Sequence, residues 1–180
     1  YGNPSSIHAE GRSVRAALET ARKTVAQSIG AGTVEIFFTS GGTESNNMAI
    51  KCAVRDLGVQ RIISSPTEHH CGTHAIETVK TVNGVEVVWL AVNSLGRIDY
   101  QDLENALANG NGKKTLVSLM HANNEIGTMI DLGKVSGLCR QYGALFHTDT
   151  VQTIGHFPIN VQETPVNFLS GAAHKFHGPK

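Results

Sequence analysis

The chain has 180 residues, enough for one domain with a hydrophobic core. Its 15 basic residues balance 15 acidic residues, which argues against a nucleic-acid-binding or membrane-surface protein. Three widely spaced cysteines, Cys52, Cys71 and Cys139, argue against a disulfide framework and favour a reducing compartment. No apolar run is long enough to span a membrane, and we therefore expect a cytoplasmic protein.

The first half of the chain has one long helical pattern followed by alternating strands and helices. Apolar residues repeat at helical spacing from Val14 to Ile29, which predicts an amphipathic helix that ends at Gly30. Beyond it the pattern predicts, in chain order, a strand at 35–39, a helix at 43–58, a strand at 61–65, a helix at 70–82 and a strand at 85–92.

The second half continues this alternation. Asp99 is the expected N-cap of a helix that buries Leu103, Ala106 and Leu107. The pattern then predicts a strand at 116–120, a helix opened by Asp131, a strand at 144–147 and a last strand at 167–169. Strands that alternate with helices indicate a three-layer α/β/α fold with a mostly parallel central sheet. We find no internal boundary, and we expect residues 1–180 to form one domain.

Five successive strand ends carry polar residues that an open α/β sheet would bring to one edge. These residues are Gly42 with Thr43, His69, Asn124, Asp149 with Gln152, and His174 with Lys175. Glycines after a strand let the backbone approach a phosphate, whose charge is met by free N–H groups and the helix dipole. A lysine held among apolar and histidine neighbours can lose its proton and act as a nucleophile.

Each of these features also has an ordinary structural explanation. Thr43 could be the N-cap of a plain strand-to-helix turn. Asp149 could pair with a neighbouring backbone donor rather than with a protonated ring nitrogen. His69 could be a buried core histidine rather than an aromatic face for a planar ligand. Together, a phosphate cradle, a stacking surface, a buried carboxylate and a lysine amine are what pyridoxal phosphate requires.

One segment raises the alternative of a metal site. His70 and His74 lie four residues apart on an expected helix, with Cys71 between them and Glu68 before them. However, no second ligand pair stands at a matching spacing, and the H-E-x-x-H pattern is absent from the sequence. We therefore predict no metal.

From Asn3 to Lys180 the chain resembles the large domain of the cysteine desulfurases, fold type I pyridoxal-phosphate enzymes of the class V aminotransferase group. The matching motifs are FTSGGTESNNMAIK at 38–51, TEH at 67–69, MHANNEIGT at 120–128, HTDTVQ at 147–152 and HKFHGPK at 174–180. Because all of them match in order and spacing, the resemblance is specific. It implies a homodimer that converts L-cysteine to L-alanine and passes the sulfur, as an enzyme persulfide, to an acceptor or scaffold protein for iron–sulfur cluster assembly.

The resemblance also implies three central roles. Lys175 would hold pyridoxal phosphate and then move protons at the substrate α-carbon. Asp149 would pair with the pyridinium nitrogen and keep it protonated. His69 would stack on the ring and assist proton transfer.

Other residues would bind the cofactor through hydrogen bonds. Gln152 would contact the phenolic oxygen of the ring, and Asn124 the ring substituents near the substrate carboxylate. Gly42, Thr43 and His174 would bind the phosphate.

Some positions depart from the family pattern. Where the family commonly has a serine that reaches the phosphate, this chain has Ala172. Ser170 is an alternative donor, but it lies in a different strand phase. The sulfur-accepting cysteine of the family lies beyond Lys180, and Cys71 does not match it. We therefore expect an incomplete large domain that is inactive alone. Selenocysteine lyase, another class V aminotransferase or lyase, and a cofactor-binding fragment without turnover remain alternatives.

Overall fold

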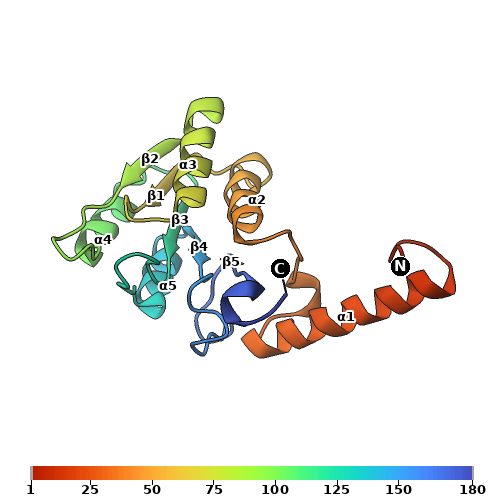
Figure 1. Ribbon diagram of the computed structural model, residues 1–180. Coiled ribbons are helices and arrows are strands. Elements are labelled where there is room, and N and C mark those ends of the chain that lie inside the picture. The colour runs from red at the N-terminus through yellow and green to blue at the C-terminus, as the bar shows by residue number, and fades with distance from the viewer. Residues whose placement is uncertain (1, 180) are drawn as a thin grey trace. The chain divides into compact units, whose positions relative to one another are not determined.

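Figure 1 shows the computed structural model of the protein, which describes residues 2–179. The chain forms two compact units. The helical unit consists of Tyr1–Phe38 and Pro158–Glu163, and the sheet unit consists of Thr39–Phe157 and Thr164–Lys180. All of the residues predicted for the site belong to the sheet unit.

The sheet unit contains a five-stranded parallel sheet with the strand order β2-β1-β3-β4-β5. Its strands are β1 (Arg61–Ser64), β2 (Glu86–Trp89), β3 (Thr115–Met120), β4 (Leu145–Asp149) and β5 (Phe168–Ser170). Every residue of β1 and β3 is buried, as expected for central strands covered on both faces. The chain adds β2 on one side of β1 and then β3 on the other side, so the strand order switches between β1 and β3. Such a switch point favours a crevice beyond the carboxyl ends of these two strands.

Four helices cover the two faces of the sheet (Figure 1): α2 (Gly42–Arg55), α3 (His70–Asn83), α4 (Tyr100–Ala108) and α5 (Leu132–Gln141). Apolar residues of α2 and α3 pack with Ile62 and Leu116 in one core cluster. Those of α4 and α5 pack with Ile63 and Val117 in a second cluster. Adjacent residues of a strand point to opposite faces, so the clusters lie on opposite sides of the sheet and the three-layer prediction is confirmed.

The helix ends follow the predicted signals in several places. Asp99 caps α4 by accepting a hydrogen bond from the Gln101 N–H at 2.8 Å, and Asp131 caps α5 through the Lys134 N–H at 2.9 Å. Gly84 ends α3 in the left-handed conformation that glycine adopts without strain. The predicted strand at 85–92 is shorter than expected, because only Glu86–Trp89 pairs with β1.

The helical unit is dominated by α1 (Ala9–Ile29), which ends at Gly30 as predicted. However, its apolar stripe is largely uncovered: the buried residues are Gly11, Ala26 and Ile29, and Leu18 is 37% exposed. No helix among residues 2–179, α1 included, is both long enough and apolar enough to cross a membrane.

The predicted strand at 35–39 is wrong. A 3₁₀ helix, η1 (Thr33–Glu35), occupies its start, and Ile36 is extended without pairing to any strand of the described chain. Phe37 and Phe38 are 69% and 50% exposed. The Arg22 guanidinium donates to the Ile36 carbonyl and lies 5.0 Å above the Phe38 ring. An apolar run becomes a strand only where a neighbouring strand offers backbone partners, and here a side chain takes one of those positions.

Candidate functional site

A cavity of about 520 Å³ lies in the sheet unit, at the carboxyl ends of β3 and β4. Every residue predicted for the site lines it: Gly42, Thr43, His69, Asn124, Asp149, Gln152, His174 and Lys175. These residues come from the start of α2, the N-cap of α3, the segments that follow β3 and β4, and the 3₁₀ helix η2 (Ala173–Phe176). The cavity is large enough for a small-molecule cofactor.

Helix α2 begins at the cavity wall. Its N-cap is Gly41, so the alternative in which Thr43 is the N-cap is wrong. The Ser45 N–H donates to the Gly41 carbonyl at 3.0 Å, which leaves the N–H groups of Gly42 and Thr43 without acceptors inside the helix. A Cβ on Gly42 would lie 2.7 Å from Val151 Cγ2, so glycine is needed for this close approach. Free N–H groups at a helix N-terminus attract an anion such as phosphate.

Asp149 ends β4 and is 7% exposed. Its Oδ1 accepts the Val151 N–H at 2.9 Å, and its Oδ2 accepts the Asn46 side-chain amide at 2.6 Å. Burial raises the pKa of Asp149, while these two hydrogen bonds and the nearby His69 oppose that rise. Each carboxylate oxygen can accept a second hydrogen bond, so the group can still receive a cationic N–H from the cavity.

His69 is the N-cap of α3 and is exposed, so the alternative of a buried core histidine is wrong. Its Nδ1 accepts the Cys71 N–H at 3.2 Å and lies 3.0 Å from the Cys71 sulfur. An Nδ1 that accepts this bond leaves the proton of the neutral ring on Nε2. The capping bond therefore fixes both the position of the ring at the cavity and its tautomer.

Asn46 belongs to the site but was not among the predicted residues. It is 1% exposed, and its amide donates to Asp149 and, at 3.2 Å, to the Cys71 sulfur. Its Oδ1 has no hydrogen-bond partner within residues 2–179. A polar residue in a helical pattern suggests a solvated surface. The sequence signal that could have identified Asn46 is its spacing, because it stands four residues after Gly42 on the same helix face.

Lys175 lies further from the end of its strand than the sequence suggested. The strand β5 stops at Ser170, and Lys175 is an exposed residue of η2 rather than a residue held among apolar neighbours at the strand end. The His156 ring donates to the Lys175 carbonyl at 2.9 Å. Phe176 packs so closely on Gly155 that a Cβ there would lie 2.6 Å from its ring. These contacts fix the turn that presents the lysine amine to the cavity.

One position at the cavity departs from the family pattern. It is Ala172, which lines the cavity two residues before His174. Ser170 cannot compensate, because it is buried and its hydroxyl lies 3.0 Å from the Ser45 hydroxyl and 3.2 Å from His147 Nε2. Lys180, which ends the last motif, lies outside the described residues.

The remaining predicted residues are more weakly held. Asn124 is exposed, and its amide donates to Glu125 at 2.5 Å, while Gln152 is half-buried in the turn after β4.

His70 and His74, the residues considered for a metal site, stack with ring centroids 5.8 Å apart. Across the part of the chain that the structure describes, no three histidine, cysteine or acidic side chains are arranged to hold a metal ion.

Comparison with known proteins gives the family. Residues 1–180 match the family described as aminotransferase class-V. The whole chain is 49% identical to the cysteine desulfurase IscS of Dictyoglomus turgidum and covers 45% of it. Among solved structures, a NifS-like protein superposes with a TM-score of 0.92 at 36% identity, over all of this chain and 49% of that chain. A structure titled SspA in complex with cysteine superposes with a TM-score of 0.91 at 32% identity, over 99% of this chain and 51% of that chain.

The chain thus spans about half the length of the relatives and structures that it matches. The family match extends over the entire sequence and agrees with the fold and with the gathered strand-end residues. The chain therefore belongs to the class-V aminotransferase family.

Proposed function

We propose that the protein is a pyridoxal-phosphate-dependent cysteine desulfurase. In the overall reaction the C–S bond of L-cysteine breaks, an S–S bond forms with an enzyme thiol, and L-alanine leaves with a new C–H bond. The observation that carries the proposal is a single cavity that joins a helix N-terminus, a buried carboxylate and a lysine amine. The names of the relatives support cysteine as the substrate.

The cavity residues fit the cofactor. The N–H groups of Gly42 and Thr43, together with His174, would hold the phosphate, and Asp149 would hold the ring nitrogen. The Lys175 amine would attach to the carbonyl carbon of the cofactor. When bound, pyridoxal phosphate supplies an electron sink for negative charge at the substrate α-carbon.

The other cavity residues orient these groups and move protons. Once free, the Lys175 amine would take the proton from the substrate α-carbon and return one. The His69 ring would lie against the cofactor face, with its Nε2 proton available for transfer. Asn46 holds the Asp149 carboxylate in place through its 2.6 Å bond. Gln152 would donate to the phenolic oxygen of the ring, and Asn124 would contact the ring substituents near the substrate carboxylate.

The sulfur-accepting thiol is proposed to lie outside residues 1–180. Burial raises the pKa of Cys139 to about 12, and it also raises those of Cys52 and Cys71. A thiol that stays protonated is a poor nucleophile. The persulfide would then serve an acceptor or scaffold protein for iron–sulfur cluster assembly, and we propose a homodimer in the cytoplasm as the working form.

Borohydride labelling tests this proposal directly. The full-length protein is mixed with pyridoxal phosphate, reduced and digested, and the labelled peptide is found by mass spectrometry. We expect the label on Lys175, its loss in Lys175→Ala, and no change in Lys51→Ala, whose lysine is exposed on α2. Label spread over surface lysines would contradict the site. Label on Lys175 without formation of alanine from cysteine would instead indicate another class V aminotransferase or lyase.

A further inference from the structure

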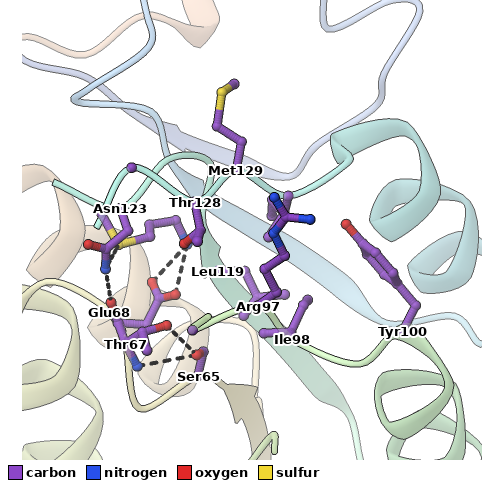
Figure 2. A pocket seen from close by; sticks show the side chains of 14 residues that line it. Ser65, Thr67, Glu68, Arg97, Ile98, Tyr100, Leu119, Asn123, Thr128 and Met129 are labelled. Atoms are coloured by element: carbon purple, nitrogen blue, oxygen red, sulfur yellow. Dashed lines mark hydrogen bonds between the residues drawn. The ribbon is translucent and has the colours of Figure 1, made fainter. Parts of the chain in front are cut away.

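A second cavity of about 440 Å³ lies beside the site, and Met120 lines both cavities. Figure 2 shows its wall, in which Ser65, Thr67 and Glu68 face Asn123. These residues belong to the two turns that follow β1 and β3. Each turn continues directly into a residue of the first cavity, His69 in one case and Asn124 in the other.

The end of β3 leaves one backbone donor without a strand partner. Strand β1 stops at Ser64, which pairs with Ser118, whereas β3 continues to Met120. The next N–H along, that of His121, donates to β4, so the Met120 N–H points toward the side that β1 has vacated. A buried N–H that lacks an acceptor is costly and must be satisfied by another group.

Glu68 supplies that acceptor. Its Oε2 and Oε1 lie 2.8 Å and 3.0 Å from the Met120 nitrogen. Figure 2 shows the carboxylate reaching from the first turn toward the second. The contact therefore gives the Met120 N–H an acceptor. It also links Glu68, the residue before His69, to the strand that leads to Asn124.

In a second hydrogen bond the side chain comes from the turn after β3 and reaches the backbone of the turn after β1. The Asn123 amide donates to the Thr67 carbonyl at 2.6 Å (Figure 2). Its Oδ1 accepts the N–H groups of Glu125 and Ile126 at 2.8 Å and 2.9 Å, which fixes the orientation of the amide. We call the Glu68–Met120 and Asn123–Thr67 contacts the turn clamp. Because each turn contributes one side chain that bonds to the backbone of the other segment, neither turn can shift without breaking at least one of these bonds.

We propose that Glu68 is a positioning residue that, through the turn clamp, holds His69 and Asn124 in register at the wall of the first cavity. The inference rests on the proposed function, because it assigns the clamp the purpose of orienting two side chains that would face the cofactor.

The ionisation of Glu68 agrees with this role. Burial raises the pKa of Glu68 to about 8, against the opposing bond from Met120 and with a further contribution from the charge of Asp149. No lysine, arginine or histidine within residues 2–179 forms an ion pair with it. A glutamine at position 68 also keeps an acceptor oxygen for the Met120 N–H, so it should preserve the contact.

Two substitutions with side chains of similar length distinguish the effect of the hydrogen bond from the effect of packing. In the full-length protein, Glu68→Gln keeps an acceptor for Met120, whereas Glu68→Met removes it. Glu77→Met on α3 is the matched control, because Glu77 is exposed and, among residues 2–179, pairs only with Lys80. Three quantities are measured: amide hydrogen exchange at Met120 without cofactor, circular dichroism of the bound cofactor, and borohydride labelling of Lys175.

We expect Glu68→Met to speed Met120 exchange about tenfold or more and to reduce the cofactor circular dichroism by about half or more, while Lys175 is still labelled. Glu68→Gln and Glu77→Met should stay within about twofold of wild type on both measures. Unchanged exchange and dichroism in Glu68→Met would overturn the inference.

If Glu68→Met does not fold, Glu68→Gln decides: a folded variant that keeps both signals supports the clamp, and one that loses them overturns it. An unlabelled wild type would mean that the proposed function has failed. In that case the exchange measurement, made without cofactor, still tests the clamp itself.

Discussion

His147 is a buried base directly beneath the site. Its Nδ1 lies 2.9 Å from the Ser118 hydroxyl and its Nε2 3.2 Å from the Ser170 hydroxyl, so both ring nitrogens have neutral partners. Burial lowers the pKa of His147 from 6.5 to about 4. Between these pH values the unfolded chain binds a proton that the folded chain does not, and the unfolded state gains stability as the pH falls.

We therefore predict that His147 contributes a rise in the free energy of unfolding from about pH 4 to about pH 6.5, and that His147→Gln removes this contribution. The raised pKa of Glu68 contributes a fall over part of the same range, so the prediction concerns the difference between the variant and wild type. The glutamine can keep hydrogen bonds to the two serines but cannot take up the proton. Urea unfolding at several pH values measures the effect, with His8→Gln, an exposed position, as the control. His121, whose pKa burial also lowers, contributes a further rise that His147→Gln leaves in place. An unchanged slope in His147→Gln would count against a neutral buried ring.

At the start of α2, a single added methyl group should disturb the cavity wall. A Cβ on Gly42 would meet Val151 Cγ2 at 2.7 Å, whereas a Cβ on Gly72, in the first turn of α3, would meet nothing within 4 Å. Gly72→Ala is therefore the matched control, and it should stabilise the protein by about 0.5–1 kcal/mol through lower backbone entropy of the unfolded chain.

We expect Gly42→Ala to weaken pyridoxal-phosphate binding by about tenfold or more, because the displaced helix end no longer points its N–H groups at the phosphate. Removing the obstructing methyl groups with Val151→Ala should restore much of the affinity. Titration of the cofactor absorption band measures both effects. If Gly42→Ala binds as well as Gly72→Ala, the phosphate does not lie at this helix end.

The helices and caps were predictable because their signals are local, as Asp99 and Asp131 show. The gathering of the strand-end residues was also predictable, since a parallel sheet places the carboxyl ends of neighbouring strands at one edge. The strand expected at 35–39 failed because pairing depends on distant neighbours. Asn46 and the turn clamp escaped prediction for the same reason, as each depends on side chains that meet only after folding.

Seen as a whole, the chain leaves much apolar surface uncovered. In the helical unit Val34 is 86% exposed and Phe37 is 69% exposed, and most of the apolar stripe of α1 lacks a partner. In the sheet unit Ile126 and Phe157 are 53% and 48% exposed. Soluble monomers rarely expose so many large apolar side chains without a partner surface.

We predict that the 180-residue chain expressed alone is poorly soluble or self-associates, because association removes these side chains from water. Light scattering of the purified chain measures its mass. Replacing Val34 and Phe37 by serine should shift the population toward monomer, while Val82→Ser, a similarly exposed position on α3, should have a smaller effect because it removes a single small side chain. A monodisperse monomer would show that the exposed residues do not drive association, and the proposed homodimer would then need an interface that these residues do not form.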